Sequence, residues 1–336
     1  MSALLINANA LNIPLADKSV QCVVTSPPYY GLRDYGTDGQ LGLEPTPDAY
    51  IANLVEVFRE CKRVLKDDGT LWLNIGDSYA SMKSRYNQKA QNLNGGKAQD
   101  NEFQGNKTDL YHHPELGIKD KDLIGIPWML AFALRADGWW LRQDIIWAKP
   151  NPMPESVKDR CTKSHEYIFL LSKSAKYYYD NEAIMEVATG FDGRKDTKYK
   201  GGPKDMAGGA HERWQYKNLQ PDGQQPNTMH LNRLEGNEYM SPVRNKRDVW
   251  TVTTKPYKGA HYATFNPELI KPCILAGAPE GGIVFDPFVG SGTTVATAIQ
   301  LGRKGIGIDL SFKYLQENAK ARVESAELPL LDFIEQ

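Results

Sequence analysis

The stretch GIVFDPFVGSGTTVATAIQLGRKGIGIDLS, residues 282–311, reads as a strand, a glycine loop, a helix and a second strand. Gly290 and Gly292 stand between the first strand and the helix. Glycine lets a ligand come close to the backbone, and a helix N-terminus favours negative charge. The second strand ends at Asp309, 19 positions beyond Gly290, about where nucleotide-binding α/β folds place the carboxylate that takes both ribose hydroxyls. The stretch therefore predicts an α/β fold that binds a ligand containing ribose.

Departures from common nucleotide motifs narrow the choice of ligand. Val295 stands where a third glycine is expected for NAD, and the absence of Gly-Lys-Ser/Thr excludes a P-loop. Asp286 ends the first strand, and its charge would repel a pyrophosphate but suits the ammonium of an amino acid. A ribose joined to a cationic amino acid indicates S-adenosylmethionine. The alternative interpretation is a plain strand-to-helix turn that holds no ligand.

A second motif, TSPPYYGLRDYG at 25–36, follows the apolar run 20–24. Pro27 and Pro28 must end that strand because proline donates no backbone hydrogen bond. They leave a stiff turn with unpaired carbonyls, the Ser26 hydroxyl before it and two tyrosines after it. The two motifs lie about 260 residues apart, yet each follows the carboxyl end of a buried parallel strand, the edge at which ligands of open α/β sheets bind. We therefore expect the fold to bring the motifs together.

The rest of the chain predicts a mostly parallel sheet with helices on both faces. A helix with Thr46 as its N-cap and Gly69 as its stop precedes a buried strand at 70–76. Helical and strand patterns alternate again after 122, as expected for an α/β architecture.

A loop and an insert interrupt the alternation of strands and helices and set the predicted domain organisation. Residues 1–180 are expected to form one half of the main domain, with a mobile loop at 81–122, and residues 259–336 the other half. The insert 181–258 is irregular, rich in Gly and Lys and poor in aliphatic residues. Between residues 190 and 258 there are 13 Lys and Arg against 8 Asp and Glu, which suits either a solvated insert or a surface for a polyanion.

Composition sets broad limits. Of the 336 residues, 41% are hydrophobic and 24% are charged, and the net charge is −1, so any attraction to nucleic acid must come from a local surface. No run of apolar residues approaches the length of a membrane span. The four cysteines lie far apart, which favours reduced thiols in a cytoplasmic protein and argues against a metal site.

The motifs resemble those of the amino-methyltransferases that modify adenine N6 or cytosine N4 in DNA. TSPPY at 25–29 resembles their (Asp/Asn/Ser)-Pro-Pro-(Tyr/Phe) catalytic motif, and VFDPFVGSGTT at 284–294 resembles their cofactor loop. GWWLRQDIIWAKPNP at 138–152 and HEYIFLLSK at 165–173 resemble the strands between catalytic motif and recognition region. HYATFNPELI resembles the segment whose aromatic residue, here Phe265, lies against the cofactor. Catalytic motif, recognition insert and cofactor loop, in that order, are typical of the β class of this family.

The resemblance implies a Rossmann-like methyltransferase fold, S-adenosyl-L-methionine as cofactor and sequence-specific methylation of a base flipped out of DNA. The Ser26 hydroxyl and the Pro27 carbonyl would accept the two N–H bonds of the target amino group, Pro28 would stiffen the turn, and Tyr29 would stack on the base. Transfer would be a direct in-line displacement. The implied cofactor-binding residues are Asp286, Phe288, Gly290, Ser291, Gly292, Thr293, Thr294, Asp309 and Phe265.

The insert would then act as the target-recognition region on double-stranded DNA. Its basic side chains, with one from the catalytic motif, are candidate DNA contacts, most of them phosphate neighbours rather than base readers. They are Arg33, Lys195, Lys198, Lys200, Arg213, Arg244, Lys246 and Arg247. A homodimer and an associated restriction endonuclease are further expectations from the resemblance.

Several alternatives stay open from the sequence. Serine at the first position of the catalytic motif, here Ser26, favours cytosine N4 within the resemblance. Some adenine enzymes also have serine there, so both bases remain possible targets. RNA, a protein glutamine, or DNA binding without catalysis are the competing functions. Tyr30 suits core packing as well as stacking, Asp77 suits the site as well as a helix cap, and Arg33 and Asp34 suit either loop order or a backbone contact.

Overall fold

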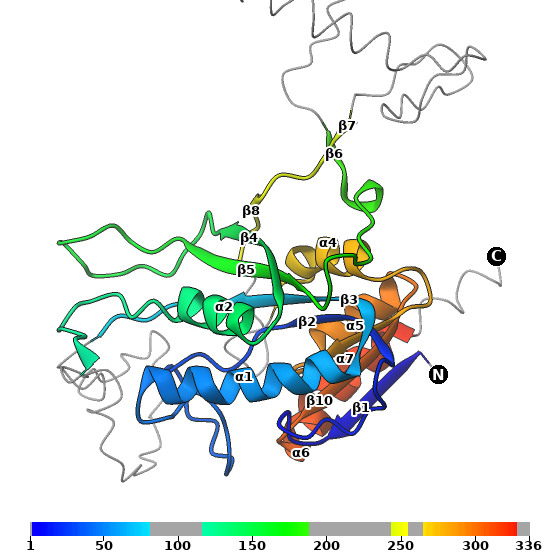
Figure 1. Ribbon diagram of the computed structural model, residues 1–336, viewed down its shortest axis with the longest axis horizontal. Coiled ribbons are helices and arrows are strands. Elements are labelled where there is room, and N and C mark those ends of the chain that lie inside the picture. Colours follow the sequence, from blue (N-terminus) through cyan, green and yellow to red (C-terminus); the bar gives the residue numbers. More distant parts are fainter. Residues whose placement is uncertain (1, 81–115, 188–242, 255–264, 328–336) are drawn as a thin grey trace, which may run out of the picture. The chain divides into compact units, whose positions relative to one another are not determined.

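The computed structural model describes residues 2–80, 116–187, 243–254 and 265–327. The chain forms two compact units, residues 181–247 and the remainder; Figure 1 labels their described helices and strands. The larger unit contains a sheet whose strand order is β1-β10-β9-β2-β3-β5-β4-β8. The strands are β1 Ala3–Asn7, β2 Val20–Thr25, β3 Leu65–Ile75, β4 Trp140–Ala148, β5 His165–Ser172, β8 Val249–Thr251, β9 Ile283–Asp286 and β10 Lys304–Asp309.

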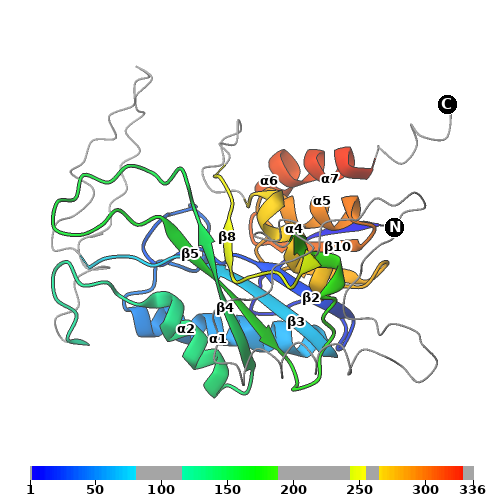
Figure 2. The ribbon, with the colours of Figure 1, turned by 90° about the horizontal axis from the view of Figure 1, so that it is seen from above.

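Every strand pair of this sheet is parallel except those of β5, which runs antiparallel to both β3 and β4. The helices are α1 Pro47–Val64, α2 Ile126–Ala136, α4 Pro267–Gly277, α5 Thr293–Gln300, α6 Phe312–Tyr314 and α7 Lys320–Glu327. Helices α1 and α2 cover one face of the sheet, and α4 and α5 cover the other, with α7 packed on α5 (Figure 2). The predicted α/β fold with helices on both faces is confirmed.

Helix α1 shows how sequence and packing set the bounds of an element. Thr46 Oγ1 accepts a hydrogen bond from the amide of Ala49, and Pro47 takes the first helical position, as predicted. The predicted stop at Gly69 is wrong, because the helix ends at Val64 and β3 begins at Leu65.

The early end of α1 has a packing reason. Leu65 is fully buried and pairs with Val20 at the start of β2, which draws the chain into the sheet four residues before Gly69. A register shift follows, so that Cys22 pairs with Thr70. Gly69 lies within this shift and leaves room for the Leu65 side chain, because a Cβ at position 69 would lie 2.8 Å from Leu65 Cδ2.

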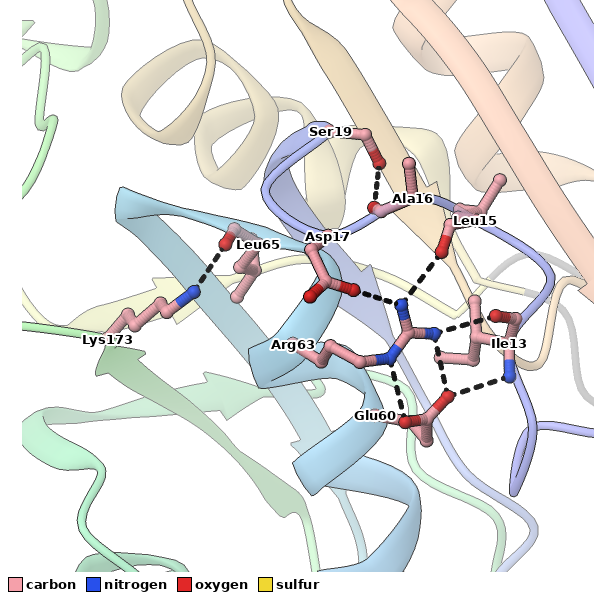
Figure 3. A network of polar contacts seen from close by, with 9 residues as sticks. All are labelled: Ile13, Leu15, Ala16, Asp17, Ser19, Glu60, Arg63, Leu65 and Lys173. Atoms are coloured by element: carbon pink, nitrogen blue, oxygen red, sulfur yellow. Dashed lines mark hydrogen bonds and ion pairs between the residues drawn. The ribbon is translucent and has the colours of Figure 1, made fainter.

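A polar network fixes the connection between β1 and β2 to the C-terminal end of α1 (Figure 3). The Arg63 guanidinium donates to the carbonyls of Ile13 and Leu15, to Asp17 and to both carboxylate oxygens of Glu60. Glu60 in turn accepts from the Ile13 amide at 3.0 Å. The network lies at the amino ends of β2 and β3, so it anchors the sheet at the edge opposite the two motifs.

The smaller unit contains a short 3-10 turn, Glu182–Ile184, and an antiparallel pair, β6 Glu186–Val187 with β7 Val243–Arg244. Across the residues that the structure describes, no helix is both long and apolar enough to span a bilayer.

Candidate active site at the carboxyl edge of the sheet

The two sequence motifs follow neighbouring parallel strands. β2 pairs with β9 through Cys22 and Val23, so the turn after Thr25 and the loop after Asp286 leave the same edge of the sheet. The two loops are joined directly: Thr25 Oγ1 donates to Asp286 Oδ1 at 2.6 Å, and Thr294 Oγ1 donates to Asp286 Oδ2 at 2.6 Å. The prediction that the fold brings the motifs together is confirmed.

Asp286 acts in the structure as the joint between the loops. Its side chain is 2% exposed, and Oδ1 also accepts a hydrogen bond from the amide of Phe288 at 3.0 Å. Burial raises its pKa from 3.8 to about 6, although the three hydrogen bonds favour the charged form. The contact with a cofactor ammonium that the sequence suggests stays a prediction, because the carboxylate already holds two threonine hydroxyls.

The glycine loop has the backbone that its sequence predicts. Gly290 and Gly292 have φ angles of 48° and 78°, in the left-handed region that glycine adopts without strain. A Cβ at Gly292 would lie 3.0 Å from the Ala319 carbonyl oxygen, so no larger residue fits without a shift. Gly292 is also the N-cap of α5 and contributes no capping side chain. The loop therefore presents bare backbone, which suits a ligand that approaches closely.

Asp309 closes this loop from the neighbouring strand. Its Oδ2 accepts a hydrogen bond from the Gly290 amide at 3.2 Å, and its Oδ1 accepts one from the Ser311 amide at 2.9 Å. Burial raises the pKa of its carboxyl group. The acidic residue and the glycine loop, which the sequence places 19 positions apart, are thus in direct contact at the end of β10.

The other predicted cofactor residues lie around the same loop. Phe288 is half-buried, and Ser291, Thr293 and Thr294 are buried. Arg322 of α7 donates to the hydroxyls of both Ser291 and Thr293, which ties the C-terminal helix to the loop. Phe265 is half-buried and directly precedes the N-cap of α4.

The turn at 26–29 is held in place by α1. Tyr50 is fully buried on α1, and its hydroxyl donates to the Pro28 carbonyl at 2.7 Å, so the prediction of an unpaired carbonyl is wrong for Pro28. Among the residues that the structure describes, none donates a hydrogen bond to the carbonyl of Pro27, which is itself buried, as the sequence predicts for the end of the strand. Ser26 is half-buried beside it.

Tyr29 points its hydroxyl into a polar cluster that the sequence did not reveal. Its Oη donates to Glu166 Oε2 at 2.7 Å, and Asn74 Nδ2 reaches the same oxygen at 3.2 Å. Lys149 forms an ion pair with Glu166, with side chains 17% and 15% exposed. The pKa of Tyr29 is raised well above 10, first by burial and then by the charge of Glu166, so the phenol stays a neutral donor.

The cluster comes from three strands, which explains why sequence reasoning missed it. Asn74 lies on β3, Glu166 on β5 and Lys149 directly after β4. These residues meet only because β5 inserts between β3 and β4. Gly76, just after β3, makes room for the phenol: a Cβ there would lie 2.6 Å from Tyr29 Cε2.

The structure decides two of the alternatives left open by the sequence. Tyr30 is 1% exposed and packs with Tyr50 at 5.5 Å between ring centroids, so it belongs to the core. Asp77 caps α2, since its Oδ1 accepts from the amides of Gly125 and Ile126 at 3.0 Å each.

The loop after the turn at 26–29 is ordered by its own residues. Asp34 accepts a hydrogen bond from the Gly36 amide at 2.8 Å, which orders a turn. Burial raises the pKa of Tyr35, which Arg33 lowers and Asp309 raises, so Tyr35 lies within electrostatic range of both residues.

The predicted DNA contacts fall into two groups. Lys195, Lys198, Lys200 and Arg213 lie outside the described residues. In the smaller unit, Arg244 and Arg247 both donate to Glu186 Oε1, at 3.0 and 2.7 Å, and Lys246 is half-buried between them in the chain.

Comparison with known proteins identifies the family of the chain. A sequence profile of the N6/N4 methyltransferase family, described as DNA methylase, matches residues 20–320. The type II methyltransferase M.Cfr9I of Citrobacter freundii is 44% identical over 315 residues, which cover 93% of this chain and 85% of that protein. The type II methyltransferase M.SmaI of Serratia marcescens is 46% identical over 293 residues, which cover 87% of this chain and 80% of that protein.

Solved structures share the fold at low sequence identity. A DNA modification methylase of Thermus thermophilus, in complex with S-adenosyl-L-methionine, matches with a TM-score of 0.56 and 19% identity over 97% of this chain and 95% of that one. The cytosine-N4-specific PvuII DNA methyltransferase matches with a TM-score of 0.56 and 13% identity over 99% and 93%. The predicted Rossmann-like methyltransferase fold is confirmed. The chain therefore belongs to the N6/N4 family of DNA methylases, and it is a sequence-specific DNA amino-methyltransferase that uses S-adenosyl-L-methionine.

Proposed function

We propose that the turn at 26–29 holds the exocyclic amino group of a flipped cytosine, and that the loop 290–294 holds the cofactor beside it. The observation that carries this proposal is the pair of hydrogen bonds from Thr25 and Thr294 to Asp286, which fixes the two loops to each other at one edge of the sheet. A base on one loop and a cofactor on the other would then be held at a fixed separation, which favours direct transfer.

The turn supplies hydrogen-bond acceptors where the chemistry needs them. An aromatic amino nitrogen is a weak nucleophile because its lone pair is delocalised into the ring. Ser26 Oγ and the Pro27 carbonyl each accept one N–H bond, which lets the nitrogen become pyramidal and frees its lone pair. The two prolines, and the bond from Tyr50 to the Pro28 carbonyl, keep these acceptors in place. Tyr29 offers its ring to the flipped base.

The glycine loop and its neighbours fit the cofactor. Asp309 already lies against the Gly290 amide, where its carboxylate can accept hydrogen bonds from ribose hydroxyls. Phe288 and Phe265 are the aromatic residues proposed to contact the adenosine, and the hydroxyls of Ser291 and Thr293 hold the loop to Arg322. When bound, the cofactor supplies an electrophilic methyl carbon for in-line displacement.

Cytosine N4 is the target that the catalytic motif favours. Ser26 at its first position leans toward cytosine in the family resemblance, and the cytosine-N4-specific PvuII enzyme shares the fold. The test is mass spectrometry of nucleosides from duplex DNA, RNA and protein incubated with the enzyme and labelled cofactor. N4-methylcytosine in the DNA alone is expected, whereas N6-methyladenine would overturn the choice of base, and label in RNA or protein would overturn the choice of substrate.

We also propose that residues 181–258, apart from β8, which pairs with β4 in the main sheet, recognise the target sequence, between two halves of the catalytic domain at 1–180 and 259–336. The support is that residues 181–247 form a compact unit of their own and that the insert carries an excess of positive charge. Arg33, Arg244, Lys246 and Arg247 are the described candidates for contacts with double-stranded DNA. A homodimer, a companion restriction endonuclease and a cytoplasmic location complete the proposal, and the endonuclease is supported by the type II naming of the relatives.

A further inference from the structure

Glu166 lies at the end of a chain of hydroxyl groups that begins at Ser26. Ser26 Oγ is 3.5 Å from Tyr29 Oη, and Tyr29 Oη is 2.7 Å from Glu166 Oε2. The first distance is long for a hydrogen bond, as contacts of unliganded active sites often are, and the second is short. The chain therefore connects the proposed acceptor of the target amino group to a largely buried carboxylate.

Every polar neighbour of Glu166 in this cluster donates to it. Lys149 Nζ contacts Oε1, while Tyr29 Oη and Asn74 Nδ2 both donate to Oε2. A lysine ammonium and an amide NH2 have no acceptor to offer at these atoms. All three neighbours are satisfied at once only by a group that accepts hydrogen bonds and donates none, which is the ionised carboxylate.

This arrangement sets the direction of each hydrogen bond in the chain. A hydroxyl has one hydrogen, and that of Tyr29 is given to Glu166, its nearest partner. The Tyr29 oxygen can then only accept toward Ser26, so the Ser26 hydrogen points at Tyr29. The lone pairs of Ser26 are left for a donor on the other side. The amino group of a base is such a donor.

We propose that Glu166 is a positioning residue that acts through Tyr29 to keep Ser26 a hydrogen-bond acceptor for the target amino group. This inference rests on the proposed role of Ser26 and adds a residue that the catalytic motif does not contain. Lys149 strengthens the effect, because its ion pair with Glu166 occupies one carboxylate oxygen and leaves the other facing Tyr29.

Glutamine at position 166 would break the chain for a specific reason. Lys149 would hold the amide oxygen, so the amide NH2 would face Tyr29 and Asn74, two groups that donate in the native site. Tyr29 would then accept from Gln, and its hydrogen would turn to one of two remaining oxygens, Asn74 Oδ1 at 3.4 Å or Ser26 Oγ at 3.5 Å. Where it turns to Ser26, the Ser26 hydrogen is displaced toward the base, and Ser26 meets the target amino group as a donor facing a donor.

The experiment is a double-mutant cycle of E166Q and Y29F in single-turnover methylation of target DNA. E166Q alone is expected to slow methyl transfer by about tenfold to 100-fold with cofactor affinity unchanged. In the Y29F background, which lacks the hydroxyl, E166Q is expected to change the rate by less than about threefold. An equal loss in both backgrounds would overturn the inference.

E60Q is the matched control. Glu60 also accepts three hydrogen bonds, from Arg63 Nε, Arg63 Nη2 and the Ile13 amide, at the opposite edge of the sheet. E60Q is expected to lower the thermal stability but to leave the rate per folded enzyme unchanged. If E60Q slowed transfer as E166Q does, the effect of E166Q would be general and the inference would be wrong.

Two further outcomes separate this inference from the proposed function. If Y29F alone leaves the rate unchanged, the hydroxyl chain is not used, although the proposed pocket can still stand. Should E166Q fail to fold, K149M/E166Q replaces it, because without Lys149 the Gln oxygen can turn to Tyr29. That double variant is expected within about threefold of K149M, and a larger loss would contradict the inference.

Discussion

At the scale of single residues, the site depends on the buried carboxylate of Asp286 and on the space that Gly76 leaves for the Tyr29 ring. Asp286 is 2% exposed and joins the turn after β2 to the start of α5 through two threonine hydroxyls. Its unfolded pKa is about 3.9, whereas burial raises the folded pKa to about 6. Between these values the folded state binds more protons than the unfolded state, so this group makes the protein less stable as pH rises.

The first prediction follows from that sign. Between about pH 4 and pH 6, the unfolding free energy of the wild type should fall relative to that of D286N, by about 2–3 kcal/mol in total. Above that window the difference should be constant. Denaturant titrations of both proteins at several pH values would measure it, and parallel stability curves would show that Asp286 does not titrate in this range.

Gly76 gives a second prediction at the same scale. A Cβ there would lie 2.6 Å from Tyr29 Cε2, so G76A should displace the phenol from its place beside Glu166. We expect the rate of methyl transfer to fall by about tenfold or more, with cofactor affinity unchanged. Single-turnover kinetics and a cofactor titration would measure the two effects. A normal rate in a folded G76A protein would mean that the position of the ring is not important.

At the scale of elements, the Arg63 network and the proposed active site lie at opposite edges of the sheet. The network around Arg63 holds the connection 8–19 to α1 (Figure 3), while both loops of the proposed site leave the carboxyl edge. Hydrogen bonds from Arg63 lower the pKa of Glu60. The lowered pKa means that ionised Glu60 stabilises the folded protein. This stabilisation is fully present above the unfolded pKa of Glu60 and is lost as pH falls through the folded pKa.

Arg63→Met should therefore destabilise the protein without changing its chemistry. The guanidinium makes five hydrogen bonds and is about one third exposed, so we expect a loss of about 1–3 kcal/mol. Thermal unfolding at pH 7 would show the loss, and it should shrink in acid as Glu60 protonates. A change in the single-turnover rate of the folded variant would contradict the separation of the two edges.

At the scale of the whole molecule, much of the fold could be predicted because local signals agree with the final topology. The glycine loop at 290–292, Asp309 and the Pro27-Pro28 turn lie where strand ends must place them, since parallel strands share a carboxyl edge. The start of α1 at Pro47 followed from its cap. Its end did not, because the burial of Leu65 against Val20 decides it, and burial depends on the assembled sheet.

The polar cluster around Tyr29 could not be predicted for a related reason. Lys149 and Glu166 lie in the two segments that resemble strands of the family, and Asn74 lies in a buried strand, but no local pattern marks any of the three as a site residue. They become neighbours only when β5 enters antiparallel between β3 and β4. Strand order is a property of the whole molecule, so site residues that depend on it are not visible in local patterns.

The smaller unit yields a prediction about DNA binding. If Lys246 neutralises one phosphate, K246Q should weaken binding to all sequences alike and reduce the slope of log affinity against log salt by about one. K66Q, at an exposed lysine in the β2–β3 register shift, is the matched control and should leave the slope unchanged. A K246Q effect confined to the target sequence would instead make Lys246 a base reader.

The central claim is that one pocket holds the amino group at Ser26 and the cofactor at the glycine loop. The most direct test is the single-turnover rate of S26A on target DNA at saturating cofactor, together with its cofactor affinity. We predict a rate about 100-fold lower and a cofactor Kd within about twofold of the wild-type value. A wild-type rate in S26A would show that Ser26 does not hold the amino group and would contradict the account.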